Sequence, residues 1–507
     1  MSHRTTLVDV FEENRRSRPL STAVVDGDKS WTYRELDDRR IALAAGLRDK
    51  GVAAGDRIVW IGANSHALIE LMSAAATLGA MVCPVNWRQS HDELVFVLDD
   101  LRPELVVWQT QYTPDQASLA RMGRARWVRF DGGEDSDYES VIAEGRAMPA
   151  HESPVSDEAA VLLLYTAAFD GKPSAAMISH RALISHSLVL GIQRRIEEGF
   201  TFLTTGPLFH VGTQMFVWAA IVLGGKTVVE PQFDALETCR LIEKEQCTAA
   251  VLFPPMVDSI IAANAGAGPQ EQLYDISSLR FGPGTEVWNS MITVDDSPWG
   301  RSNAGYGQTE VAGMLTYHGL GSNGIGTHGR PSPLVQLRIV DRDWDDVPDG
   351  ETGEMIARGL HVFDGYFERP DLNSRKFHRG WMRTGDLGRR EMDGTVTFVG
   401  PASRMIKSGG ENIYPAEVEK TLSAHPRVKS VAVIGRPDPA WGQSVTAVVV
   451  ADGHVDEHEL ISFFRDRVAS YKKPRTVIFA ESIPMSGWFP DYDSLDRIYG
   501  GGGYPGS

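Results

Sequence analysis

The chain has 507 residues, of which 42% are hydrophobic, so it can bury large cores, and its length favours more than one domain. Its formal net charge is −17, from 50 basic and 67 acidic residues, which argues against nucleic acid as a main partner and against attraction to anionic lipid. The sequence has neither a signal-peptide core near its N-terminus nor a run of about 18 apolar residues, so we expect a cytoplasmic protein without a transmembrane segment.

Helical patterns alternate with short extended runs in the first part of the chain. The helical stretches are residues 41–47, 68–78 and 236–245, and the extended runs that follow them are residues 57–61, 81–85 and 249–253. This alternation is typical of helices packed on mostly parallel sheets, so we predict an α/β fold. The three cysteines, Cys83, Cys239 and Cys247, lack metal-site or disulfide spacing, and we expect buried thiols.

A turn near residue 170 has the outline of a phosphate-binding loop. The apolar run at residues 160–165 predicts a buried strand, and a helix-compatible stretch at residues 182–190 follows the capping candidate Ser179. The turn between them contains Gly171 and Pro173. A loop that cradles phosphate needs small residues, hydroxyl groups and a cation.

The tip of this turn departs from those needs. It reads Ala167, Ala168, Phe169 and Asp170, followed two residues later by Lys172. A carboxylate about 4 Å from a phosphate oxygen repels it by roughly 1 kcal/mol in water and by about 4 kcal/mol at an effective dielectric constant near 20. Asp170 therefore weakens phosphate binding unless Lys172 turns inward to offset it.

The chain changes character after residue 330. Extended runs at residues 335–340, 354–357 and 395–399 are separated by DG and GE turns, which predicts a β-rich unit. From residue 404 the pattern is again mixed, with helices expected at 415–424 and 457–468 and strands at 428–434 and 444–450. We predict a large domain of residues 1–403, with two mostly parallel sheets and the β-rich part, and a small mobile α+β domain of residues 404–507. The tail at residues 496–507 has the composition of a flexible segment.

Five segments resemble, in the same chain order, the motifs of the adenylate-forming (AMP-binding) enzymes, which include the acyl-CoA synthetases. The turn resembles the family loop Tyr-Thr-Ser-Gly-Thr-Thr-Gly-x-Pro-Lys-Gly, which it matches at Tyr165, Thr166, Gly171 and Pro173. The next three matches are Pro207-Leu208-Phe209-His210-Val211-Gly212, Tyr306-Gly307-Gln308-Thr309-Glu310 and Arg383-Thr384-Gly385-Asp386. The fifth is residues 400–415, GPASRMIKSGGENIYP. The ordered match covers most of the chain.

The resemblance implies roles for the matched residues of the large domain. Tyr306 would stack on adenine, Gly307 would allow close approach, and Thr309 would bond the α-phosphate. Glu310 would hold Mg²⁺ through its oxygens, and His210 would line the mouth of the acyl pocket. Further nucleotide contacts are implied for Thr166, Gly171, Gly282 and Gly284.

The resemblance also implies roles in the later segments. Asp386 would accept hydrogen bonds from the ribose hydroxyls. Pro401 stands where the family has a ribose-binding arginine, and Arg404, at the hinge position, would partly substitute for it. Gly409, Gly410 and Glu411 would guide the thiol of CoA, and Lys407, just before them, would also contact the cofactor.

The family's adenylating lysine has no counterpart here. The entry to its loop is matched by Ile483-Pro484, but no lysine occurs after Lys473. The loop lysine, the ribose arginine and this lysine all serve ATP phosphates or adenylate formation, so their loss concerns one half of the reaction. Removal of such cations commonly costs a few kcal/mol of transition-state stabilisation.

Three hypotheses about function remain open. The first is an acid:CoA ligase that uses ATP and Mg²⁺ to activate a fatty or aryl acid and transfers it to coenzyme A, with Thr309, Glu310 and His210 in the catalytic site. The second is a regulatory homologue that binds nucleotide or acyl-CoA without turnover. The third is an adenylating enzyme for a non-standard acid such as nitrite. A homodimer is compatible with each.

Overall fold

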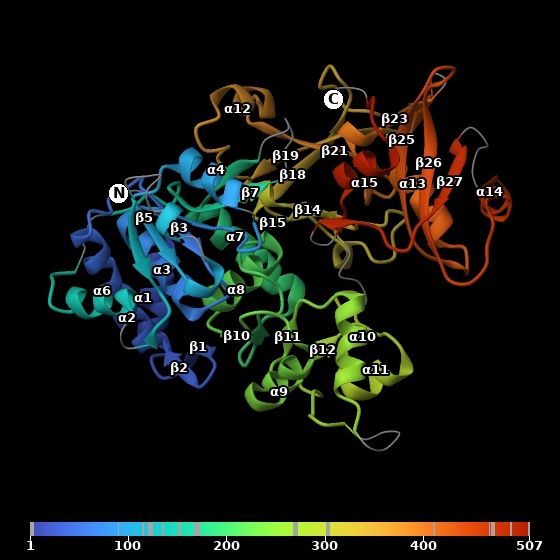
Figure 1. Ribbon diagram of the computed structural model, residues 1–507. Helices are drawn as coiled ribbons and strands as arrows, with labels where there is room; N and C mark the ends of the chain where they lie inside the picture. The colour runs from blue at the N-terminus through green and yellow to red at the C-terminus, as the bar shows by residue number, and fades with distance from the viewer. Residues whose placement is uncertain are drawn as a thin grey trace. The chain divides into compact units, whose positions relative to one another are not determined.

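The computed structural model describes most of the chain, and the chain divides into two compact units (Figure 1). The first comprises Met1–Ser322, Gly329–Gln336 and Arg358–Met382, and the second comprises Asn323–His328, Leu337–Ala357 and Arg383–Ser507. The boundary expected between residues 403 and 404 falls inside the second unit and stays a prediction. The described residues are 5–89, 91–113, 116–119, 125–133, 136–150, 154–166, 173–266, 272–300, 305–408, 411–465, 467, 472–486 and 489–504.

The first unit contains a six-stranded sheet with the order β6-β5-β3-β4-β7-β8. Its neighbouring strands are parallel except for β7 and β8. Ile58, Val59 and Trp60 of β3 are all buried, as expected of a strand covered on both faces. The strands are β3 (Arg57–Ile61), β4 (Met81–Pro84), β5 (Leu105–Trp108), β6 (Arg126–Arg129), β7 (Ala160–Thr166) and β8 (Ser174–Ser179).

The strand β8 is absent from the sequence prediction, which placed only a turn between residue 165 and the next helix. Its Ala175 and Ala176 have low strand propensity, so local preference gives no signal. They pair with Tyr165 and Leu164 of β7 in an antiparallel ladder. This pairing satisfies the backbone groups of a buried segment, and it determines the strand where propensity does not.

A second sheet in the first unit has five strands in the order β11-β9-β10-β1-β2. All its pairings are parallel except that of β1 with β2. The two mostly parallel sheets confirm the predicted α/β class. The strands are β1 (Thr22–Asp26), β2 (Lys29–Thr32), β9 (Thr201–Leu203), β10 (Lys226–Val229) and β11 (Ala249–Ala250).

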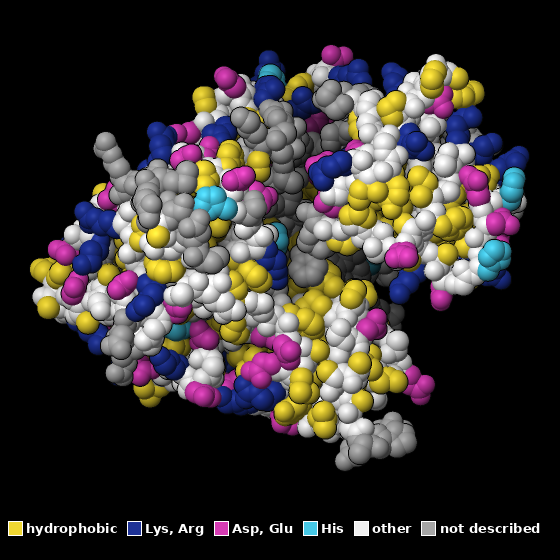
Figure 2. Space-filling view, in the orientation of Figure 1, with side chains coloured by type: hydrophobic (Ala, Val, Ile, Leu, Met, Phe, Trp, Pro, Cys, Tyr) yellow, Lys and Arg dark blue, Asp and Glu magenta, His cyan; other side chains and the backbone are white. Residues whose placement is uncertain are grey.

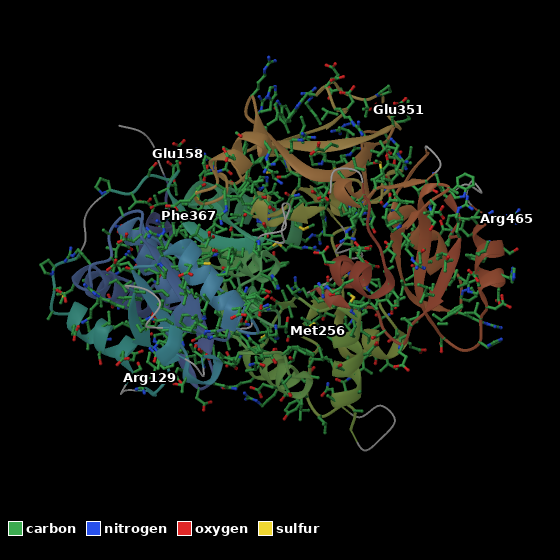
Figure 3. The ribbon with its side chains drawn as sticks, turned by 45° about the horizontal axis from the view of Figure 1, so that its top comes forward. Arg129, Glu158, Met256, Glu351, Phe367 and Arg465 are labelled. Atoms are coloured by element: carbon green, nitrogen blue, oxygen red, sulfur yellow. The ribbon has the colours of Figure 1, made fainter. Side chains whose placement is uncertain are left out.

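The helices of the first unit pack on these sheets, and α1, α2, α3 and α6 contact one another (Figure 1). Several of these helices begin at a capping side chain, as in α7, where the hydroxyl of Ser179 accepts the N–H of Ala182 at 3.3 Å. Met256, labelled in Figure 3, lies on α10. The helices are α1 (Leu7–Ser17), α2 (Tyr33–Asp49), α3 (His66–Leu78), α4 (His91–Leu101), α5 (Gln116–Leu119), α6 (Asp137–Gly145), α7 (His180–Arg194), α8 (Val211–Leu223), α9 (Ala235–Glu245), α10 (Pro254–Ala263), α11 (Glu286–Met291) and α12 (Pro370–Lys376).

The thiols of the three cysteines are buried and unpaired, as predicted. Burial raises the pKa of Cys239 and of Cys247 to about 12, and it also raises the pKa of Cys83. These thiols are therefore protonated at neutral pH and serve as small core residues.

Short strands lead into the β-rich part that the sequence predicts. The short pairs are β12 (Arg280–Phe281) with β13 (Thr293–Val294), β14 (Gly307–Gln308) with β15 (Gly313–Met314), and β16 (Thr316–Tyr317) with β17 (Arg330–Pro331). A five-stranded sheet follows, with the order β18-β19-β21-β20 and with β22 paired to β21. Its strands are β18 (Val335–Val340), β19 (Thr352–Gly359), β20 (Phe377–His378), β21 (Trp381–Arg390) and β22 (Val396–Pro401).

The second unit contains a five-stranded sheet in which β27 pairs with β26, and β25, β26 and β27 lie side by side (Figure 1). Val418 and Leu422 of α13 and Leu460 and Phe464 of α14 are buried in one of its cores. The strands and helices are β23 (Ile406–Ser408), β24 (Glu411–Ile413), α13 (Pro415–Ser423), β25 (Val428–Asp438), β26 (Gly442–Ala451), α14 (Glu457–Arg465), β27 (Thr476–Phe479), β28 (Met485–Ser486), β29 (Phe489–Pro490) and α15 (Tyr492–Tyr499).

The prediction of a flexible tail is wrong for the described residues up to 504. The helix α15 begins after the cap Asp491, whose side chain accepts the N–H of Ser494 at 3.0 Å. Leu495 is fully buried against the sheet of the second unit, and Tyr504 is only 7% exposed. Composition suggested flexibility because glycine dominates residues 500–503, but Gly500, Gly502 and Gly503 have positive φ angles that turn the chain, and Gly501 packs closely against Asp496.

Candidate active site

The segment from Tyr306 to Glu310 contains the first strand of a short antiparallel hairpin, β14–β15, in the first unit. Gly307 pairs with Met314 across β14 and β15, and a Cβ at Gly307 would overlap the carbonyl oxygen of Gly313. Only glycine fits at this position, which explains the glycine of the motif. The N–H of Tyr306 donates to the hydroxyl of Thr316 at 2.9 Å.

The side chain of Tyr306 is only 6% exposed. Most of the ring therefore packs within the first unit, and only a small part of it is open to solvent. Its predicted stacking on adenine stays a prediction.

Glu310 is a buried carboxylate with a defined partner. It is 3% exposed, and its Oε1 accepts a hydrogen bond of 2.7 Å from the hydroxyl of the buried Tyr366. Its carbonyl oxygen accepts the N–H of Phe363 at 2.8 Å. The sequence analysis missed Tyr366, because nothing in the sequence signals its contact with Glu310, from which it is 56 residues away. The pair holds one carboxylate oxygen in place.

The fit of Mg²⁺ to Glu310 can be judged from the donors available. Within the described ranges there is no group of three or more His, Cys, Asp or Glu side chains that could hold a metal ion. Mg²⁺ is commonly held by one or two carboxylates, with phosphate oxygens and water completing the shell. A single carboxylate at Glu310 fits that mode and does not fit an all-protein cage. Thr309 is half-buried beside it, at the start of a short 3₁₀ turn.

His210 lies at the N-terminus of α8. Its carbonyl oxygen accepts the N–H groups of Thr213 and Gln214, both at 3.2 Å, and its ring lies 4.7 Å from that of Phe209. Burial lowers the pKa of His210, and the charge of Arg88 lowers it further. The imidazole is therefore neutral at pH 7.

The loop before His210 is held by Asn64. The Oδ1 atom of Asn64 accepts the N–H of Leu208 at 2.8 Å, and its Nδ2 donates to the carbonyl oxygen of Gly206 at 2.9 Å. Behind it, the Nε2 of Gln214 donates to the carbonyl oxygen of Leu208 at 2.6 Å. Two buried amides thus orient the chain that carries His210, and a sequence pattern offers no signal for either.

The helix α8 also has an open side. Gly212 lies two residues after His210, and a Cβ at Gly212 would meet no heavy atom within 4 Å. Two aromatic side chains of α8, Phe216 and Trp218, have other surroundings. Trp218 is buried and donates to Oε1 of Gln214 at 2.9 Å, while the ring of Phe216 stacks on that of Phe202. These two rings belong to the core.

The glycine turn after β12 is also well held. The N–H of Gly284 donates to Oδ1 of Asn289 at 2.8 Å, and a Cβ at Gly284 would lie 2.9 Å from the ring of Trp288. Gly282 is half-exposed beside it. Hydrophobic side chains gather on the surface over α10 and α11 (Figure 2), and Val287 is 56% exposed there.

The two ends of the predicted phosphate loop are described, but its tip is not. Thr166 pairs with Ser174 at the end of the β7–β8 ladder. The hydroxyl of Tyr165 donates to Asp100 at 2.7 Å, and Asp100 in turn forms an ion pair with Arg369. Gly171 lies outside the described residues, together with Asp170 and Lys172.

Asp386 belongs to the second unit and lies in the strand β21, where it pairs with Pro401 of β22. Gly385 has a φ of 81°, and the hydroxyl of Thr384 accepts the N–H of Asp386 at 3.1 Å. Thr384 itself donates to the carbonyl oxygen of Met355 at 2.7 Å. The Nε of Arg383 pairs with Glu354 at 2.8 Å. The Asp386 side chain is half-buried at a fixed position in β21.

The guanidinium of Arg404 already interacts with side chains of the second unit. It forms ion pairs with Asp493 and Asp496, and its guanidinium lies over the rings of Tyr492 and Tyr504. Its predicted contact with ribose would require it to leave these partners. Lys407 is exposed on β23, Gly409 and Gly410 lie outside the described residues, and Glu411 is described only as backbone in β24.

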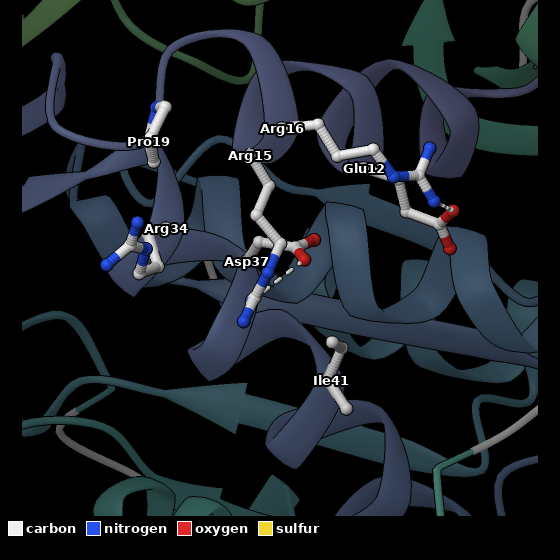
Figure 4. Close-up of a pocket in the computed structure, with 7 residues that line it drawn as sticks. All are labelled: Glu12, Arg15, Arg16, Pro19, Arg34, Asp37 and Ile41. Carbon is white, nitrogen blue, oxygen red and sulfur yellow. Dashed lines mark hydrogen bonds and ion pairs between the residues drawn. The ribbon is translucent and has the colours of Figure 1, made fainter.

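A surface pocket of about 650 Å³ lies on α1 and α2, away from these residues (Figure 4). Its charges are largely paired with each other, since Arg15 contacts Asp37 and Arg16 contacts Glu12, both at 3.2 Å. No predicted site residue is among those that line it, which are Glu12, Arg15, Arg16, Pro19, Arg34, Asp37 and Ile41.

Among the helices of the described residues, none is both long enough and apolar enough to cross a membrane.

Comparisons with known proteins give a consistent result. A feruloyl-CoA synthase from Amycolatopsis is 34% identical over 483 residues, which is 93% of this chain and 95% of that protein. An indoleacetate–CoA ligase from Aromatoleum aromaticum is 32% identical over 479 residues, with 92% and 93% coverage.

Solved structures share the fold. ATP-bound MatB from Rhodopseudomonas palustris superposes with a TM-score of 0.84 at 24% identity, covering 98% of this chain and 99% of that one. The O-succinylbenzoate coenzyme A synthetase of Bacillus subtilis, in complex with AMP, gives 0.75 at 22% identity, with 94% and 95% coverage. The family model of AMP-binding enzymes matches residues 11–367, and that of the AMP-binding enzyme C-terminal domain matches residues 417–487. The chain therefore belongs to the AMP-binding enzymes.

Proposed function

We propose that the protein is an ATP-dependent acid:CoA ligase that acts on aryl acids. The observation that carries the proposal is the buried Glu310, held by Tyr366 on a hairpin where only glycine fits at position 307. The aryl preference is supported by the relatives named for feruloyl and indoleacetate substrates, at 34% and 32% identity over most of the chain.

The first half-reaction activates the acid. A carboxylate oxygen of the acid attacks the α-phosphorus of ATP, the bond to pyrophosphate breaks, and an acyl-adenylate forms. Thr309 would donate its hydroxyl to an α-phosphate oxygen, and Asp386 would accept from the ribose hydroxyls. Mg²⁺, held by Glu310, would supply charge neutralisation at the phosphates.

The second half-reaction makes the thioester. The sulfur of CoA attacks the acyl carbonyl carbon, AMP leaves with the bonding electrons of the mixed anhydride, and the thiol proton is released. The neutral His210 fits the first half-reaction, because a cationic imidazole would hold the acid as an ion pair and oppose its attack on ATP. Lys407 and Glu411 would lie on the thiol side.

Two observations favour a second candidate, a homologue that binds nucleotide or acyl-CoA without turnover. No lysine follows Lys473, and Arg404 is engaged by two carboxylates and two aromatic rings. Both features would weaken adenylate formation. This candidate requires AMP or acyl-CoA to bind while no pyrophosphate is formed.

The test is a panel of hydroxycinnamic, indoleacetic and fatty acids at millimolar ATP and Mg²⁺, with pyrophosphate and acyl-CoA measured separately. We expect pyrophosphate release with aryl acids and CoA-dependent AMP formation. Asp386→Ala should raise the KM for ATP, and Glu310→Gln should slow pyrophosphate release. Calorimetric binding of AMP with no pyrophosphate from any acid would overturn the ligase in favour of the binding homologue.

A further inference from the structure

The glycines of the C-terminal segment, residues 489–504, let this segment turn back onto β25. Gly500 and Gly503 have φ values of 75° and 72°, which favour glycine. A Cβ at Gly501 would overlap the side chain of Asp496, and the N–H of Gly502 donates to the carbonyl oxygen of Gly435 at 2.9 Å. The glycine run is therefore a folded element that brings Tyr504 back onto β25.

This segment surrounds the guanidinium of Arg404. The side chain of Arg404 is 14% exposed and forms ion pairs with Asp493 and Asp496. Its Cζ lies 5.2 Å from the ring centre of Tyr492 and 5.1 Å from that of Tyr504. Two carboxylates and two aromatic faces around a planar cation form a site that suits arginine and does not suit lysine.

A second connection reaches the strand that follows Arg404. Gln443 is buried, its Oε1 accepts the N–H of Lys407 at 2.8 Å, and its Nε2 donates to the carbonyl oxygen of Gly502 at 2.7 Å. The carbonyl of Gly502 thus orients the amide that holds Lys407. The hydroxyl of Tyr504 accepts the N–H of Gly435 at 2.9 Å and donates to Asp496 at 3.0 Å, which joins the two connections.

Gly435 packs closely against the side chains of Gln443, Ile406 and Tyr504, so no larger residue fits at this position. A Cβ there would lie 2.7 Å from Nε2 of Gln443 and 3.1 Å from both Ile406 and the ring of Tyr504. Ile406 is fully buried in the same core. Residues 404–407 are thus held from one side by the sheet and from the other by the C-terminal segment.

We propose that the C-terminal segment is a positioning element for the β23–β24 pair, acting through Arg404 and Gln443, and that it serves the thioester half-reaction. The inference rests on the proposed function, which places Lys407 and Glu411 on the thiol side. It assigns Arg404 the role of a positioning residue and not that of a nucleotide ligand.

Hydrogen exchange tests the positioning without any need for activity. In Arg404→Met, the peptide spanning residues 402–414 should exchange about tenfold faster than in the wild type, while peptides of α13 and β26 stay unchanged. Arg404→Lys should give an intermediate rate, because it keeps the charge and loses the planar fork. Arg497→Met is the matched control, since Arg497 is an exposed arginine on α15, the helix that carries Asp493 and Asp496. Unchanged exchange at 402–414 in Arg404→Met would overturn the proposal.

Kinetics test the link to the thiol step. Synthetic acyl-adenylate is supplied together with CoA, so that adenylation is bypassed. In this assay we expect the KM for CoA to rise about tenfold in Arg404→Met and Asp496→Asn. In a separate assay with ATP and the acid, pyrophosphate release and the KM for ATP should stay within twofold of the wild type.

The outcomes separate this inference from the proposed function. A raised KM for ATP with an unchanged thioester step would make Arg404 a nucleotide ligand and overturn the inference. A parallel loss of both steps together with a lower melting temperature would reduce the segment to a stabilising role, and would also overturn it. A wild type that forms no pyrophosphate and no acyl-CoA would refute the ligase, while the exchange result would still decide whether the segment positions β23 and β24.

Discussion

The hydroxyl of Tyr366 donates a 2.7 Å hydrogen bond to Oε1 of Glu310, and both side chains are buried in the first unit. In Tyr366→Phe this carboxylate oxygen loses its partner, which costs about 1–3 kcal/mol for a buried group. We expect a lower midpoint in urea unfolding and slower pyrophosphate release. Tyr274→Phe is the control, because Tyr274 is half-exposed, and it should change neither measurement. Equal midpoints for the two variants would contradict the prediction.

Gly212 offers a test of the space beside His210. Because a Cβ there meets nothing within 4 Å, Gly212→Ala should stabilise α8 by about 0.5–1 kcal/mol through lower backbone entropy in the unfolded chain. Gly212→Leu should fill the space and reduce kcat/KM for bulky aryl acids more than for small acids. The contrasting variant is Gly307→Ala, whose Cβ would overlap the carbonyl oxygen of Gly313, and it should destabilise. An unchanged acid preference in Gly212→Leu would mean that the acid binds elsewhere.

The buried His361 predicts a pH dependence of stability. Burial lowers its pKa to about 4, below the value of about 6.5 for an exposed histidine. Since the unfolded state takes up the proton first, this contribution to stability is complete above pH 6.5 and is lost as the pH falls toward 4. Urea unfolding of the wild type and of His361→Leu should therefore converge or cross in favour of the variant as the pH falls from 7 to 4. Parallel curves would show that His361 does not titrate in this way.

Asp170 gives a prediction that comes from the sequence alone. If its carboxylate repels a phosphate oxygen by roughly 1 kcal/mol or more, Asp170→Thr should increase the rate of pyrophosphate release at subsaturating ATP by about fivefold or more. Asp170→Glu keeps the charge and should behave like the wild type. The measurement is the initial rate at several ATP concentrations, and equal rates in all three proteins would remove Asp170 from the phosphate site.

Strands with a regular apolar pattern of their own were predicted correctly from the sequence. β3 has the predicted bounds of residues 57–61, and β18 those of residues 335–340. The predicted extended run at 249–253 is shorter in the structure, because Pro254 begins α10 and only Ala249–Ala250 pairs with β9. The bounds of an element can thus be predicted from its own sequence, except where a neighbouring element or the length of the partner strand shortens it.

Long-range partners account for what could not be predicted. The motif residues Thr309 and Glu310 are visible in the sequence, but Tyr366, 56 residues away from Glu310, is not. The C-terminal segment gave the opposite error, since its glycine-rich composition indicates flexibility while Gly435, Gln443 and Arg404 provide contacts to Gly502 and Tyr504 that order it. A single sequence contains no signal for such contacts, which depend on the folded position of distant side chains.

Because all three thiols are buried, a single introduced cysteine can be labelled selectively for spectroscopy. Cys83, Cys239 and Cys247 are inaccessible and protonated at neutral pH, so maleimide reagents should leave the native protein unmodified. A cysteine introduced on the exposed face of α15, for example Arg497→Cys, would then be the reactive handle for a fluorophore or spin label. Such a label could report directly on whether the C-terminal segment stays docked while substrate turns over.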